Sequence, residues 1–303
     1  MHRFVFLSTY PIIWFFSKLP FWVLHLISDG IYFLLFYVIG YRKEIVLNNL
    51  KLAFPEKKEK ALKKIRKDFY HHFVDIFIEM IKSFTISEKA LNKRYKYTNP
   101  EIFKTLEAGG KSVIMMGSHY ANWEWIINIQ SMTSINCVGA YTRLSNPYYD
   151  RLIRKNRSRF GSDFVPTKHT IKNLLENKKN NIPSLYGLLS DQSPQLQKTH
   201  YWAPFLGVTV PIHTGAEMLA KKHDFVVTYM NVTKIKRSHY SISFEILTEN
   251  PKEFQDYEIT DIFLEKVTKE IVKNPALYFW THNRFKHKDK APSESTQKVR
   301  VKN

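Results

Sequence analysis

His119 and Glu124 are the two residues whose types and spacing most directly suggest chemistry. A neutral imidazole that is oriented by a carboxylate can remove a proton from an alcohol. Glu124 follows His119 by five residues, so the two side chains could meet across a turn. We therefore expect His119 to act as a general base and Glu124 to fix its tautomer. The same spacing also occurs where a turn histidine only packs or caps, so the elements around it matter.

The segments on either side of His119 predict a strand followed by a helix. Residues 112–116 are a short apolar run bounded by glycines, which is typical of a buried strand, and residues 123–127 can begin a helix. His119 would then lie on a strand-to-helix turn, with Glu124 in the first helical turn. Ser118 is not expected to be a nucleophile, because neighbouring side chains point apart in an extended turn.

The stretch His119-Tyr120-Ala121-Asn122-Trp123-Glu124 resembles the signature of the lipid A late acyltransferases, membrane enzymes that carry an H-x4-D/E motif. Further stretches are similar to other parts of that family and follow in its order. These are Tyr41-Arg42-Lys43 with Asn48-Asn49-Leu50 and Ala53-Phe54-Pro55, Tyr141 to Pro147, Arg157 to Gly161, Ser190 to Pro194, Pro204 to Gly207 and Trp280 to Lys286. Several ordered matches are far more specific than any one of them.

The resemblance implies the α/β fold of glycerolipid acyltransferases and transfer of a fatty acyl chain to a hydroxyl of a lipid A precursor. The expected donor is acyl carrier protein, with acyl-CoA as the alternative, and no cofactor or metal is expected. Because a thioester is already activated, direct transfer without an acyl-enzyme is expected. Rival hypotheses are acylation of a lysophospholipid or amino-acid lipid, a non-catalytic membrane-bound scaffold, and a metal-dependent hydrolase.

Composition favours anionic partners. The net charge is +19 and the sequence pI is about 9.7, which suits lipid headgroups or an acidic carrier protein. Nucleic acid is not expected, because the lysines are dispersed and no nucleic-acid-binding motif is present. The single cysteine, Cys137, excludes an intrachain disulfide framework, and its apolar surroundings suggest packing rather than reactivity.

The N-terminal region is different in kind, because residues 4–41 are overwhelmingly apolar and aromatic. Residues 21–39 are long enough to span a bilayer, but Asp29 lies in their middle. We expect a membrane anchor, either one tilted span or an interfacial hairpin of two helices near 4–17 and 20–40; a buried pair of core helices is the alternative. Arg42 and Lys43 favour the cytoplasmic side of a bacterial inner membrane for the domain that follows.

The chain accordingly divides into an anchor at 1–41, an acyltransferase domain at 42–286 and a basic polar tail at 287–303. Residues 56–84 predict an amphipathic helix; His71 and Asp75 lie on it, but a metal site there is not expected. From residue 99 onward, strand and helix signals alternate, and 225–247 resembles a hairpin. We therefore expect an α/β fold with a mixed sheet flanked by helices. Further strands are expected at 135–141, 183–189 and 276–281, and helices at 168–177, 213–223 and 258–273.

Other candidate site residues follow predicted strands or form a basic strip. Arg143 follows the strand at 135–141 and would bind an acceptor phosphate or a thioester oxyanion, unless it pairs with Asp150. Arg157 and Arg159 belong to a strip, residues 151–159, that carries five basic side chains and suits a carrier protein or lipid phosphates. Asp191 and Gln192 are expected to shape the donor site, and Arg284 to bind phosphate. Apolar surface for an acyl chain is expected from Trp125, Phe164, Trp202, Phe205 and Leu206, unless these belong to the core.

Overall fold

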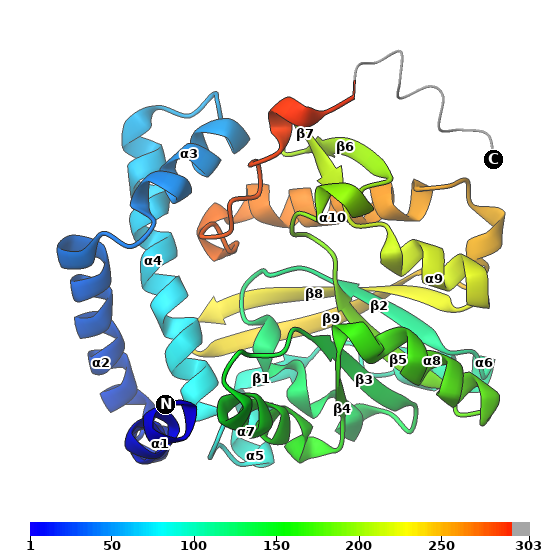
Figure 1. The fold of residues 1–303 in the computed structure, drawn as a ribbon, viewed down its shortest axis with the longest axis horizontal. Coiled ribbons are helices and arrows are strands. Elements are labelled where there is room, and N and C mark those ends of the chain that lie inside the picture. Colours follow the sequence, from blue (N-terminus) through cyan, green and yellow to red (C-terminus); the bar gives the residue numbers. More distant parts are fainter. Residues whose placement is uncertain (293–303) are drawn as a thin grey trace.

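The computed structural model describes residues 1–292, so most of the predicted tail at 287–303 lies outside the described residues. Its centre is a seven-stranded sheet in the order β1-β9-β8-β2-β5-β3-β4, with helices on both faces (Figure 1). Neighbouring strands are parallel except β8 and β9, which form an antiparallel hairpin. The predicted α/β fold with a mixed sheet is therefore confirmed.

The strands of the sheet agree with most of the predicted ones. Their bounds are β1 Tyr95–Tyr97, β2 Val113–Gly117, β3 Asn136–Tyr141, β4 Asp163–Pro166, β5 Ser184–Leu189, β8 Val226–Lys236 and β9 His239–Thr248. A separate antiparallel pair, β6 Tyr201–Phe205 and β7 Val208–Ile212, was not expected. The predicted strand at 276–281 is wrong: that segment contains the short helix η7, Pro275–Leu277, and only a single bridge, Tyr120 with Tyr278.

The helices follow the apolar periodicity of the sequence. Their bounds are α1 His2–Lys18, α2 Phe21–Phe33, η1 Leu34–Ile39, α3 Lys43–Ala53, α4 Glu59–Lys82, α5 Glu88–Arg94, α6 Ile102–Gly109, η2 Trp123–Met132, α7 Pro147–Arg157, η3 Ser158–Phe160, η4 Thr167–His169, α8 Thr170–Lys179, η5 Leu196–Lys198, α9 Gly215–His223, η6 Pro251–Glu253, α10 Glu258–Lys273 and η8 Lys288–Lys290. The helices α9 and α10 lie on one side of the sheet, and α5 and α7 on the other (Figure 1). Because both faces are covered, every residue of β2 is buried.

The N-terminal helices attach to one end of this body. The helix α2 lies beside α4 (Figure 1) and buries Leu24, Ser28 and Tyr32. Its other face, with Trp22, Leu26 and Phe33, is exposed, so the alternative of a buried pair of core helices is wrong. Within the described residues, one helix, Phe21–Ile39, is long and apolar enough to cross a membrane.

Candidate active site

The ends of two neighbouring parallel strands bring His119 and Asp191 together. Gly117 of β2 is the register partner of Leu189 of β5, so the residues that follow each strand meet at one edge of the sheet. His119 Nδ1 lies 2.8 Å from Asp191 Oδ1. The Asp191 side chain is fully buried, whereas that of His119 is 20% exposed. Trp123 and Phe279 pack their rings against the imidazole.

The electrostatics of this pair favour one tautomer of His119. Burial alone would raise the pKa of Asp191, but the charge of His119 and its hydrogen bond outweigh burial, so the pKa lies below its ordinary value. An ionised carboxylate accepts a hydrogen bond, so the proton of neutral His119 belongs on Nδ1. Nε2 is then the basic nitrogen, and His119 lines a cavity. This is the arrangement that a general base requires.

The predicted pairing of Glu124 with His119 is wrong. The Glu124 carboxylate is held by Arg157 of α7, with Nη2 at 2.6 Å from Oε1 and Nε at 3.1 Å from Oε2. The physical reason is local geometry and competition. Ala121 has a left-handed backbone, with φ 50°, and the segment after it is a 3-10 helix capped by Asn122. Asp191 already occupies Nδ1 of the imidazole, and a guanidinium binds a carboxylate with two parallel hydrogen bonds.

His119, Glu124 and Arg157 all line a cavity of about 750 Å³. Its lining is largely apolar and includes Met115, Val138, Leu185, Leu188, Leu219 and Met230. Gly139 leaves room for the Phe164 ring, which lines this cavity, because a Cβ there would come to 2.5 Å from that ring. A cavity of this size and lining suits a flexible apolar chain whose polar end stays near His119. Of the five apolar residues proposed from the sequence, Phe164 lines this cavity, while Trp125, Phe205 and Leu206 are buried in the core.

A smaller apolar groove of about 180 Å³ adjoins the cavity. It lies between α1, α4 and α7, where it is lined by Ile13, Phe77 and Leu152. Glu124 and Arg157 line both spaces, so the ion pair stands where cavity and groove meet. Two apolar spaces therefore meet at the Glu124–Arg157 pair.

The basic residues predicted from the sequence have three different environments. Arg143 is exposed in the loop between β3 and α7. Arg157 alone of the predicted strip lines the cavity. Arg159 donates to the backbone carbonyl of Ser83, at the end of α4, with an Nη1 to O distance of 2.6 Å. The remaining members of the strip, Arg151, Arg154 and Lys155, are exposed.

Arg284 does not have the environment that phosphate binding requires. It is 1% exposed and donates to the backbone carbonyl of Pro211, at 3.1 Å, and to the Ser193 hydroxyl. The prediction that Arg284 contacts a substrate phosphate is therefore wrong, because the side chain lies in the core beneath the loop that carries Asp191. Gln192 lines the cavity, as its predicted role in shaping the site requires. Burial raises the pKa of Cys137 to about 12, which agrees with a packed thiol.

Sequence reasoning missed two features of this site. The first is that Asp191 pairs with His119; the only signal for it was that each residue follows a predicted strand. The second is the contact of Phe279 with the imidazole, for which the sequence offers no signal, because residues 276–281 read as a strand.

The chain is similar to known proteins over most of its length. Residues 3–287 match the model of the family described as bacterial lipid A biosynthesis acyltransferase. The chain is 24% identical, over 286 residues, to a lipid A biosynthesis acyltransferase of Haemophilus influenzae, with 91% of this chain and 88% of that protein covered. It is 22% identical to a lipid A biosynthesis lauroyltransferase of Escherichia coli, with 91% and 89% covered.

Proposed function

The chain belongs to the bacterial lipid A biosynthesis acyltransferase family and is an acyltransferase; on this premise we propose that it moves a fatty acyl chain from acyl carrier protein to a hydroxyl of a lipid A precursor. One observation carries the catalytic part of the proposal. His119 has Nδ1 held by a buried carboxylate and lines an apolar cavity large enough for an acyl chain. No cofactor or metal ion is needed for this reaction.

The proposed step uses His119 Nε2 as the general base. Nε2 takes the proton of the acceptor hydroxyl while the hydroxyl oxygen attacks the thioester carbon. The carbon–sulfur bond then breaks, an ester is formed, and the departing thiolate takes the proton from the imidazolium. Asp191 stabilises the imidazolium between these two events. Arg157, fixed by Glu124, supplies a positive charge at the cavity for the carbonyl oxygen or an acceptor phosphate.

The two apolar spaces suit the two substrates. The larger cavity would take the donor's acyl chain, and the groove beneath α1 would admit the acceptor from the membrane side. Arg143 and the exposed basic residues 151–155 would bind the acidic carrier protein or lipid phosphates at the surface. Gln192 and Phe164 would shape the space next to the thioester.

Membrane attachment is proposed to run through α1 and α2. Their exposed faces carry large apolar side chains, among them Phe4, Trp14 and Trp22. Asp29 does not face a bilayer unpaired, because Arg237 binds its carboxylate at 2.7 Å. Such helices can rest in one leaflet against the catalytic domain, on the cytoplasmic side of the bacterial inner membrane.

The direct test incubates the purified, detergent-solubilised protein with acyl carrier protein loaded with a fatty acid and a lipid A precursor that has a free hydroxyacyl hydroxyl. Mass spectrometry should show the acceptor gain one acyl group, and omission of the donor should abolish the product. A phosphate-free acceptor should react more slowly if Arg143 or Arg157 binds phosphate.

Three results would contradict parts of the proposal. Equal or faster transfer to a lysophospholipid would reassign the acceptor. Faster transfer from acyl-CoA would reassign the donor. A hydroxylamine-labile acyl group on the protein would exclude direct transfer to the hydroxyl.

A further inference from the structure

Glu79 of α4 is a buried carboxylate that the proposed reaction does not use; it is 1% exposed. Its Oε2 accepts hydrogen bonds from Asn122 Nδ2 at 2.5 Å and from the Tyr240 hydroxyl at 2.9 Å. Its backbone carbonyl accepts from the indole Nε1 of Trp125 at 3.1 Å. One residue of α4 therefore contacts both the cap and the first turn of η2.

Asn122 links this carboxylate to the active site. Its Oδ1 accepts from the backbone amides of Glu124 and Trp125, each at 3.1 Å. These two bonds identify the amide oxygen, so the NH2 group must be the one that faces Glu79. Asn122 is fully buried, and a buried NH2 group requires an acceptor. Glu79 supplies that acceptor.

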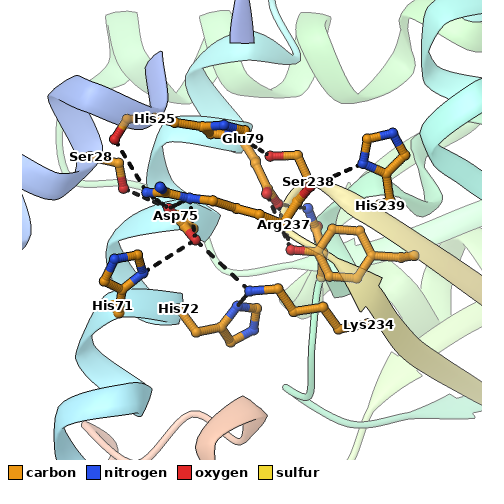
Figure 2. Close-up of polar contacts among 12 residues, drawn as sticks. His25, Ser28, His71, His72, Asp75, Glu79, Lys234, Arg237, Ser238 and His239 are labelled. Atoms are coloured by element: carbon orange, nitrogen blue, oxygen red, sulfur yellow. Dashed lines mark hydrogen bonds and ion pairs between the residues drawn. The ribbon is translucent and has the colours of Figure 1, made fainter. Parts of the chain in front are cut away.

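Glu79 also belongs to a larger group of charged residues, here called the polar seam: Asp29, His71, Asp75, Glu79, Lys234 and Arg237. Figure 2 shows Glu79 and Asp75 on the same helix, with Arg237 and Lys234 of the β8–β9 hairpin reaching Asp75. Arg237 bridges Asp75, at 2.6 Å, and Asp29 of α2, at 2.7 Å. The seam thus runs from the N-terminal helix α2 to the residue that holds Asn122.

We propose that Glu79 and Asn122 are positioning residues: together they fix the first turn of η2, and through it they place Glu124 against Arg157 at the cavity. The inference rests on the proposed acyl transfer for its catalytic consequence. Glu124 has its amide bound by Asn122 and its carboxylate bound by Arg157, so a shift of the turn moves the ion pair. Neither Glu79 nor Asn122 lines the cavity.

The charges around Glu79 predict how substitutions behave. Asp75 of α4 repels the carboxylate, while Lys234 of β8 and the hydroxyl of Tyr240 on β9 favour its ionised form. Arg94 of α5 lies within electrostatic range. An Asn122→Asp substitution would place a second carboxylate against Glu79, and the two would have to share a proton. In the double variant with Glu79→Gln, the glutamine NH2 can donate to the carboxylate introduced at position 122, which restores a matched pair.

The experiment measures kcat and KM for both substrates in N122D, in E79Q and in the double variant E79Q/N122D. We expect N122D to lose roughly 10- to 100-fold in kcat at pH 8, with a smaller loss near pH 6, where the shared proton is retained. E79Q should keep about a third or more of the wild-type kcat, and the double variant should recover most of the loss. Tyr95→Phe is the matched control, because Tyr95 is buried beside Tyr240 and its hydroxyl has no hydrogen-bond partner among the described residues.

Hydrogen–deuterium exchange of the peptide that contains the Glu124 and Trp125 amides separates this inference from the proposed function. Faster exchange in N122D and recovery in the double variant support positioning, even if wild-type protein transfers no acyl group to the chosen acceptor. Unchanged exchange in N122D, or equal kcat losses in N122D and the double variant, would overturn it.

Discussion

The site around His119 and the polar seam on α4 contain the same kinds of side chain. Each has a histidine against a carboxylate: His119 with Asp191 at 2.8 Å, and His71 with Asp29 at 3.0 Å. Each also has an arginine bound to an acid. The two regions differ in the surroundings of the histidine. His119 lines an apolar cavity, whereas His71 lies between α2 and α4 in the seam.

The buried acids of the two regions also differ in their partners. Asp75 is bound by the guanidinium of Arg237, whose charge is permanent at any physiological pH. Asp191 is bound by an imidazole, a group that can accept and release a proton. A permanent partner holds two helices and a hairpin together, while a titrating partner can take part in proton transfer. Residue types alone therefore do not identify a catalytic site; access and the nature of the partner do.

The largest expected difference between the two regions is in catalysis. His119→Ala should lower the rate of acyl transfer by roughly two to four orders of magnitude, the usual contribution of a general base. His71→Gln, which keeps a donor for Asp29, should leave the rate within about threefold of wild type. Initial rates measured by mass spectrometry of the acylated lipid check both. Equal losses in the two variants would show that His119 has no special role.

The second difference contrasts two arginines. Arg237→Ala leaves the Asp75 carboxylate buried without its guanidinium, which should destabilise the protein by about 3–5 kcal/mol. Arg157→Ala removes a partly exposed pair and should cost less than about 1 kcal/mol of stability while lowering kcat/KM. Thermal unfolding in detergent, together with rates measured below both transitions, tests the contrast. A severe loss of stability in R157A would show that the Glu124–Arg157 pair mainly stabilises the fold, as the polar seam does.

The third difference lies between the two carboxylates near His119. Asp191→Asn should lower kcat by about 100-fold, because an amide at Nδ1 no longer stabilises the imidazolium. Glu124→Gln should weaken the hold on Arg157 and lower kcat by about 10-fold, because the guanidinium is then less firmly placed at the cavity. Steady-state kinetics with each substrate varied in turn separates the two effects. If E124Q lowered kcat more than D191N does, the assignment of Asp191 as the partner of the general base would need revision.

The fold was largely predictable because periodicity and length act locally. The amphipathic pattern of 56–84 became α4, and the strands at 112–116 and 183–189 became β2 and β5. The failure at 276–281 has a physical cause. Trp280 is buried and donates to the Pro275 carbonyl at 2.6 Å, so these apolar residues fill the core with a single bridge, Tyr120 with Tyr278, in place of a strand. A short apolar run cannot distinguish a buried strand from a buried loop.

The site was predictable only in part. The place of His119 at a strand end followed from the local pattern, but its carboxylate partner comes from 72 residues away along the chain. The spacing of the motif favoured Glu124 as the partner of His119, because the two residues are close in the sequence. Which acid reaches Nδ1 depends on strand order, and strand order depends on long-range packing. The burial of Arg284 has the same origin, because no local signal shows what will cover a side chain.

The smallest expected effect contrasts Glu79 with Asp75, one turn away on α4. Burial raises the pKa of Glu79 to about 7, whereas hydrogen bonds from His71, Arg237 and Ser28 outweigh burial and hold the pKa of Asp75 below its ordinary value. Glu79 therefore contributes stability that is lost as pH rises towards 7, and Asp75 contributes stability that is lost only in acid. Between pH 5.5 and pH 8, E79Q should gain about 2 kcal/mol of stability relative to wild type.

Asp75→Asn, the matched variant on the same helix, should keep a constant difference from wild type over that range, because Asp75 stays ionised throughout it. Denaturant unfolding at half-unit pH steps, followed by tryptophan fluorescence, measures both differences. Parallel curves for E79Q and wild type would mean that Glu79 is already ionised at pH 5.5. Glu79 would then carry a full negative charge next to Asn122 at every working pH. The pH dependence expected for N122D would in that case have to come from the new carboxylate alone.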